Sequence, residues 1–199
     1  MNRDEPNNVE QQQTFNAIMQ SVLSFDSHEF HFISGPGGTG KSALFRKLQA
    51  ACRAEGILIS ICAAITLAAL LFEGATTAHS LFGYPVEELE DIDDQIPAQC
   101  NFSEERSALL HEVLVIFWDE IVSNDRSLFE AVLHAMKTKW EKPQYYVFIC
   151  AGDFAQVRFL LFTNDWQSFY MSSLMEMPFP FFRYFQLSKG MKSQLFSVR

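Results

Sequence analysis

The fold of this chain is decided by one stretch, Gly35-Pro36-Gly37-Gly38-Thr39-Gly40-Lys41-Ser42. It matches the phosphate-binding loop Gly-x-x-x-x-Gly-Lys-Ser/Thr, whose glycines let backbone N–H groups point at phosphate oxygens. An apolar strand pattern over 30–33 precedes it, and a helical pattern over 43–51 follows it. The start of that helix adds the positive end of its dipole. The stretch therefore predicts a nucleotide site, with Lys41 on the β- and γ-phosphates and the Ser42 hydroxyl on Mg²⁺.

On both sides of this loop, apolar strand patterns alternate with helical patterns along the sequence. Runs that are apolar on both faces, as covered parallel strands are, lie at 57–62, 113–118 and 145–150. Helical spacing of apolar residues is found at 9–23, 67–72, 103–111 and 127–140. This alternation predicts an α/β fold, a parallel sheet with helices on both faces.

Composition narrows the class of protein. The chain has 199 residues, 48% of them hydrophobic, which is typical of a folded domain and excludes disorder for most of its length. Fifteen Lys and Arg face 24 Asp and Glu, a net charge of −9. Proteins that coat nucleic acid or anionic membranes need an excess of basic residues, so any contact with nucleic acid is expected to be local and weak.

Cysteine spacing and hydropathy indicate the cellular compartment of the protein and whether the sequence predicts a membrane span. The four cysteines are far apart and form no Cys-x-x-Cys pair, and the start of the chain is polar, which favours a reducing compartment over secretion. The most apolar stretch, 57–72, is shorter than the roughly 18 residues of a membrane span. We expect it to be a buried strand leading into a buried helix. The five histidines lack metal-site spacing and are interpreted as structural.

Two further strand ends carry polar side chains. Asp119 and Glu120 follow the second apolar run, where a carboxylate could hold Mg²⁺ and the adjacent Glu could polarise the attacking water. An Asp-Glu pair in isolation more often caps a helix, but its coupling to the upstream loop favours the catalytic interpretation. Gln156 follows the third run and is a candidate sensor of the γ-phosphate, although such a Gln is more often a loop residue.

By these residues the chain resembles the petite-integration-frequency type of DNA helicases, superfamily 1 motors, and especially their Helitron-transposon branch. The similar segments are Asn8-x-Glu10-Gln11, the loop 35–42, Thr77-Ala78-His79-Ser80-x-Phe82, Cys100-Asn101-Phe102-Ser103, Trp118-Asp119-Glu120, Gly152-Asp153-Phe154-x-Gln156 and 187–192. The resemblance implies a RecA-like P-loop NTPase domain and ATP-driven unwinding of single-stranded or forked DNA in repair, recombination or telomere maintenance. It also implies Mg²⁺ as cofactor and a nuclear location, with mitochondrion or cytosol as alternatives.

The resemblance also implies roles for particular residues. Gln11 would read the adenine, and Lys192 stands where the family has an arginine that reaches the γ-phosphate. The expected nucleotide-binding residues are Gln11, Gly35, Gly37, Gly38, Thr39, Gly40, Lys41, Ser42 and Lys192. The expected catalytic residues are Lys41, Glu120 and Gln156, and the expected metal ligands are Ser42 and Asp119.

The expected organisation is a Gln-motif helix over 1–24, a RecA-like ATPase domain over 25–160 and an aromatic tail over 161–199. The aromatic residues from Phe159 to Phe185 either stack on single-stranded bases or form core or interface. We expect the second RecA-like domain of such motors to be absent from this chain. The alternative functions are a truncated or decayed transposon-type domain that binds nucleotide without helicase activity, and an unrelated ring-forming ATPase.

Overall fold

The strand that leads into the glycine-rich loop lies in the interior of the sheet. The computed structural model describes residues 9–24, 29–85, 99–138, 147–153, 181–187 and 195–198. In it β1 (Glu29–Ser34) is buried throughout and lies between β5 (Val147–Gly152) and β6 (Phe181–Gln186), parallel to both. The loop therefore starts from the interior of a sheet, which fixes its position.

The other described strands extend this sheet on both sides. They are β2 (Ile59–Ala63), β3 (Thr76–Thr77), β4 (Val115–Asp119) and β7 (Leu195–Val198). The order is β3-β2-β4-β5-β1-β6-β7, and within the described residues only β7 runs antiparallel, on β6. Ser34 pairs with Gly152, and Ala63 with Asp119. The carboxyl ends of the strands thus meet at one edge of the sheet, where ligands of open α/β sheets bind.

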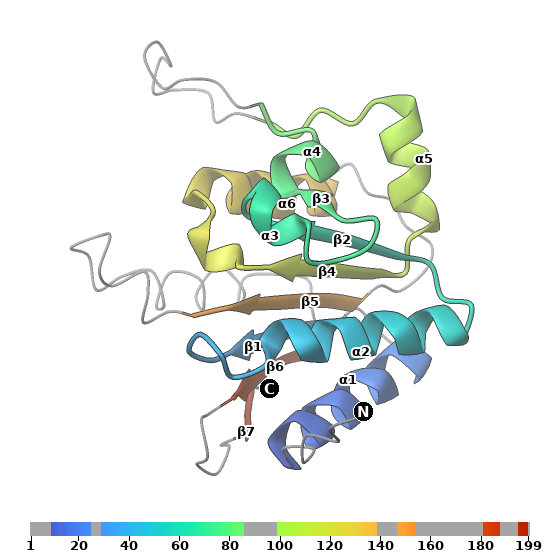
Figure 1. The fold of residues 1–199 in the computed structure, drawn as a ribbon. Helices are drawn as coiled ribbons and strands as arrows, with labels where there is room; N and C mark the ends of the chain where they lie inside the picture. Colours follow the sequence, from blue (N-terminus) through green and yellow to red (C-terminus); the bar gives the residue numbers. More distant parts are fainter. Residues whose placement is uncertain are drawn as a thin grey trace, which may run out of the picture.

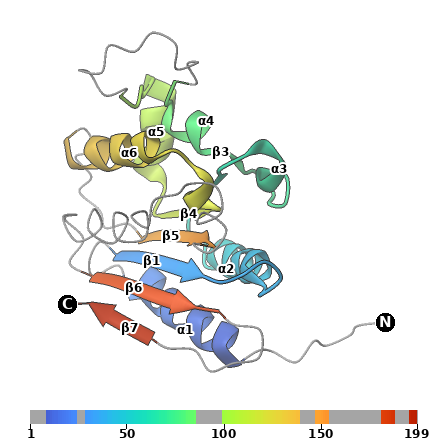
Figure 2. The same ribbon diagram turned by 90° about the vertical axis from the view of Figure 1, so that its left-hand side faces the viewer.

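Helices cover both faces of the sheet (Figures 1 and 2). On one face lie α1 (Val9–Ser24) and α2 (Lys41–Ala54). On the other lie α4 (Ala78–Phe82), α5 (Glu104–Glu112) and α6 (Arg126–Thr138). The prediction of an α/β, RecA-like P-loop domain with a parallel sheet is confirmed.

Side chains alternate between the two faces along each strand, because successive residues of a strand point to opposite sides. Phe32 packs among the side chains beneath α4 and α6, whereas Ile33 packs beneath α1 and α2. On β4, Trp118 likewise packs on the side of α4 and α6, and Phe117 on the side of α1 and α2. Strands buried on both faces produce the continuous apolar runs of the sequence.

The segment after β2 corrects one expectation. A buried helix was predicted over 67–72, but α3 (Thr66–Ala69) is a single turn, and large apolar side chains around it face solvent. The exposed residues are Ile65, Leu67, Leu70 and Leu71. Only Ala69 and Phe72 of this segment are buried. A short apolar run therefore did not predict burial at these positions. None of the helices in the described part of the chain has the length and apolar character that a bilayer crossing requires.

Within the aromatic tail the structure describes residues 181–187, which include β6, and β7. Phe185 is 3% exposed and stacks on His31, and Tyr184 stacks on Phe32 of the neighbouring strand. Phe185 therefore belongs to the core, and the partly buried Tyr184 packs against it. The aromatic residues over 159–180 lie outside the described residues, and the boundaries at 24 and 160 stay predictions.

Candidate nucleotide site

The glycine-rich loop adopts a conformation that only glycine accommodates easily. Gly38 and Gly40 have φ angles of 79° and 87°, in the left-handed region. A Cβ atom on Gly35 would lie 2.7 Å from Thr39 Oγ1 and 2.8 Å from the Leu187 carbonyl oxygen. Gly40 precedes α2, whose first turn begins with Leu44 N donating to the Gly40 carbonyl at 2.9 Å. The loop is therefore built directly onto a helix N-terminus, the arrangement that binds phosphate.

Lys41 lies folded back against this loop. Its side chain is 6% exposed, and Nζ donates to the carbonyl oxygens of Gly35 at 2.6 Å and Pro36 at 3.4 Å. Nζ also lies 3.9 Å from Glu120 Oε1. A buried ammonium must be paired, and here main-chain carbonyls and one carboxylate supply the pairing. Phosphate oxygens would be stronger acceptors for the same group.

Gln11 reaches the loop from α1. Its Nε2 donates to the Thr39 carbonyl oxygen at 2.8 Å, and its amide lies so close to Gly40 that a Cβ atom there would clash with it. Thr39 in turn donates its hydroxyl to the Pro36 carbonyl at 2.9 Å. The structure therefore brings Gln11 to the loop from 28 residues away, and links α1 to the candidate site.

The two candidate carboxylates lie at the end of β4. Asp119 is 2% exposed, and burial together with the neighbouring Glu120 charge raises its pKa to about 6 despite the Lys41 ammonium. Burial also raises the pKa of Glu120, an effect that Lys41 opposes and Asp153 reinforces. Perturbed carboxylates in a cluster with a lysine are typical of reactive sites. A raised pKa makes Glu120 a better proton acceptor for water.

Glu120 has an unusual backbone. Its φ is 50° and its ψ is 38°, and it is the one non-glycine residue with positive φ in the described residues. Such a conformation costs on the order of 1–3 kcal/mol and persists where surrounding structure enforces it. Glu120 N donates to Asp119 Oδ1 at 3.1 Å, and the Glu120 side chain remains 30% exposed. The turn therefore directs a partly accessible carboxylate beside Lys41.

Sequence reasoning did not assign Asp153 to the site. It follows β5 directly, is 6% exposed, and its charge acts on Glu120. The signal that identified Asp119, a carboxylate at the end of a buried parallel strand, applies equally to Asp153. Asp153 is therefore a third carboxylate of the candidate site, coupled to it through Glu120.

The donor set fits Mg²⁺ only with a nucleotide present. Ser42 is the second residue of α2 and Asp119 ends β4, which places a hydroxyl and a carboxylate at the same edge of the sheet. Among the described residues, no group of three or more His, Cys, Asp and Glu side chains could hold a metal alone. Mg²⁺ typically takes one or two protein ligands plus phosphate oxygens and waters, so the residues fit that mode.

Some of the predicted site residues thus lie together in the structure. Gln11, the loop 35–42, Asp119 and Glu120 converge at the carboxyl edge of β1 and β4. Within the loop, Gly37 and Gly38 are exposed, whereas Gly35, Thr39 and Lys41 are buried. Gln156 and Lys192 lie outside the described residues, and their roles stay predictions.

Known proteins resemble this chain in sequence and in fold. The sequence model of the family described as PIF1-like helicase matches residues 7–193. A crystal structure of Bacteroides Pif1 bound to ssDNA superposes with a TM-score of 0.61 at 20% identity, covering 94% of this chain and 43% of that one. Pif1 helicase from Candida albicans gives a TM-score of 0.61 at 22% identity, covering 95% and 40%.

A Bacteroides sp Pif1 in complex with ADP-AlF4 gives a TM-score of 0.57 at 19% identity, covering 94% of this chain and 43% of that one. At these identities the structural matches establish the shared fold. The chain spans about two-fifths of the length of these structures. No curated protein matches the sequence.

Proposed function

The chain belongs to the PIF1-like helicase family, and on this premise we propose that it is the first motor domain of an ATP-dependent DNA helicase, binding and hydrolysing Mg²⁺-ATP. The observation that carries the proposal is the meeting of Lys41 and Glu120 at 3.9 Å beside the glycine-rich loop. A phosphate-binding loop alone supports binding, whereas an adjacent carboxylate of raised pKa supports hydrolysis.

The proposed binding step exchanges the partners of the loop. Lys41 leaves the Gly35 and Pro36 carbonyls for the β- and γ-phosphates, and the loop N–H groups donate to the phosphate oxygens. Gln11 reads the adenine in this proposal and would exchange its present partner, the Thr39 carbonyl, for the base. Ser42 and Asp119 would hold Mg²⁺, which neutralises charge on the phosphates.

The proposed hydrolytic step uses Glu120 as the general base. Its carboxylate accepts a proton from the attacking water, the water oxygen bonds to the γ-phosphorus, and the bond to the β-phosphate oxygen breaks. Burial raises the pKa of Glu120, and the negative charge of Asp153 adds to that effect. Gln156 is proposed to sense the γ-phosphate, and Lys192 to contact it in place of an arginine.

Single-stranded or forked DNA is the proposed second ligand, held weakly by this domain because its net charge is −9. Productive unwinding is proposed to need a second RecA-like domain. Roles in repair, recombination or telomere maintenance, and a nuclear location, are part of the same proposal.

The test is steady-state ATP hydrolysis, with and without single-stranded DNA, compared with Glu120→Gln. We expect the unaltered chain to exceed that variant clearly. Turnover no higher than that of Glu120→Gln, with ATP binding retained, would favour a nucleotide-binding domain without catalysis. Absence of ATP binding would reject the proposal.

A further inference from the structure

The turn that follows β4 determines where the Glu120 carboxylate points. After Glu120 the chain makes one turn of 3-10 helix, η1 (Ile121–Ser123), and Asn124 then returns to an extended conformation. Ser123 N donates to the Glu120 carbonyl at 2.9 Å, and Asn124 N to the Ile121 carbonyl at 3.0 Å. These local bonds shape the turn but do not attach it to the sheet.

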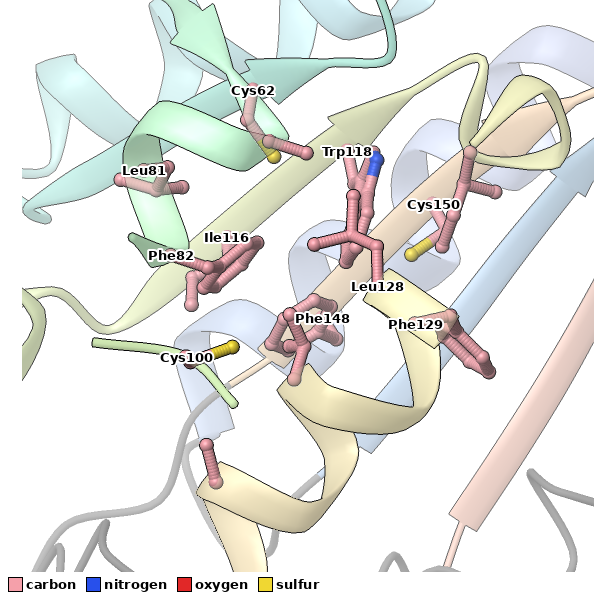
Figure 3. Packing of buried hydrophobic residues seen from close by; sticks show 14 of the residues in the cluster. Cys62, Leu81, Phe82, Cys100, Ile116, Trp118, Leu128, Phe129, Phe148 and Cys150 are labelled. Carbon is pink, nitrogen blue, oxygen red and sulfur yellow. The ribbon is translucent and has the colours of Figure 1, made fainter. Parts of the chain in front are cut away.

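One side-chain hydrogen bond makes that attachment. The Trp118 indole Nε1 donates to Asn124 Oδ1 at 2.8 Å across six residues, and both side chains are buried, with exposures of 0% and 6%. Figure 3 shows Trp118 in the core, with Cys62 and Cys150 of the adjoining strands on either side. The indole packs against Phe82 and Phe129, with ring centroids 5.2 Å and 6.2 Å away. Its N–H is therefore a fixed point for Asn124.

The turn has a second contact with the sheet, at Val122. Ile121 and Val122 are buried in the same cluster as Trp118. Val122 lies so close to Gly152 that a Cβ atom on that glycine would be 2.8 Å from both Val122 methyl groups. The turn is thus held at Asn124 and at Val122, and Glu120 lies between Trp118 and these two points.

We infer that Asn124 is a positioning residue for ATP hydrolysis, holding Glu120 in its left-handed conformation through the hydrogen bond from Trp118. The inference rests on the proposed role of Glu120 as general base. Asn124 contacts the core rather than the site, and acts only through the backbone of the turn. No sequence pattern indicated this role.

The first test does not depend on activity. Glycine adopts positive φ without the penalty that alanine has, so Glu120→Gly should have a higher urea midpoint than Glu120→Ala while the turn is held. In an Asn124→Ala background, and separately in a Trp118→Phe background, this advantage should shrink to less than half. An equal advantage in all backgrounds, or none in the unaltered turn, would overturn the inference.

The second test uses turnover. Asn124→Ala and Trp118→Phe should each lower kcat for ATP roughly ten- to a hundredfold with little change in KM, and the double variant should lose no more than the single ones. In a Glu120→Gln background, Asn124→Ala should cause no further loss, because it acts through that carboxylate. Tyr84→Phe is the matched control, since it removes an exposed 2.8 Å bond to Ser127 near the start of α6 but outside the turn.

An Asn124→Ala variant with unchanged kcat, or with an undiminished loss in the Glu120→Gln background, would contradict the inference. A chain that hydrolyses no ATP at all would reject the proposed function, and the urea comparison would still decide whether Asn124 holds the turn.

Discussion

Buried ionisable groups lie near both ends of β1, and the two sets have different kinds of partners. At its carboxyl end, Lys41 is paired with main-chain carbonyls and lies 3.9 Å from a partly exposed Glu120. At its amino end, Glu29 accepts from Ser21 Oγ at 2.6 Å, lies 3.2 Å from His31 Nε2 and 3.8 Å from Arg183 Nε. The first set can exchange its partners for a ligand, whereas the second fastens α1 and β6 to β1.

This contrast shows that burial of charge alone does not identify a functional site. Glu29 and Asp119 are comparably buried, at 6% and 2% exposure. Burial raises the pKa of Glu29, but the nearby His31, Ser21 and Arg183 together hold that pKa below its usual range. The pKa of Asp119 is raised to about 6. Neighbouring groups therefore stabilise the charged form of the Glu29 carboxylate, whereas the charged form of the Asp119 carboxylate is destabilised.

The largest expected effect is at Lys41. Lys41→Ala should lower ATP turnover by about 10²–10³-fold, because it removes a fixed positive charge from the phosphates. Thermal unfolding should show a retained fold. Lys47→Ala, an exposed lysine on the same helix, is the matched control and should leave turnover unchanged. Comparable turnover in the two variants would break the contrast between the ends of β1.

Glu120→Gln should lower kcat by at least about 10²-fold, because an amide cannot accept the proton of water. Calorimetry should show ATP binding retained, since Lys41 and the loop are unaltered. Glu112→Gln, on an exposed glutamate at the end of α5, should behave like the unaltered chain. A Glu120→Gln variant that turns over ATP normally would rule out Glu120 as the base.

At the amino end, Glu29→Ala should destabilise the fold by about 1.5–3 kcal/mol, because it removes a buried charged acceptor from Ser21. Urea unfolding measures this, and the KM for ATP should not change. Glu73→Ala is the contrasting variant, because the Arg53–Glu73 ion pair is largely exposed and is expected to contribute about 0–1 kcal/mol. Equal losses in both variants would refute a structural role for the Glu29 cluster.

The smallest expected effect is a change in pH dependence. Burial lowers the pKa of His31, so the unfolded chain binds this proton more readily than the folded one. Stability should therefore fall as pH drops below about 6.5, by at most about 1.4 kcal/mol per pH unit from this group. His31→Leu should flatten the stability profile between pH 7 and 5, while His111→Leu, at an exposed site, should not. Identical slopes in both variants would contradict this assignment.

Local patterns predicted the parts of the fold and site that depend on few residues. The glycine-rich loop, β1 and α2 are consecutive, and Asp119 and Glu120 follow a buried strand, so spacing was sufficient. The Glu29 cluster joins three elements, and the Trp118–Asn124 bond depends on how an indole packs among distant aromatics. Such contacts arise only when the sheet is assembled.

The prediction of a buried helix over 67–72 was wrong for a related reason. Its leucines have the composition of a core helix, but the segment lies beyond the end of β2, and only Ala69 and Phe72 turn inward. The spacing of apolar residues over six positions does not indicate whether another element packs against that side of the helix. The roles of Gln156 and Lys192 stay predictions.

We propose that the carboxyl end of β1 is a nucleotide site, at which Lys41 binds phosphate in place of the main-chain carbonyls. Calorimetric titration of the chain with ATP and Mg²⁺, beside Lys41→Ala, tests it most directly. We expect one ATP to bind per chain, with affinity lost in Lys41→Ala. No detectable binding by the unaltered chain, or equal affinity in the variant, would contradict it.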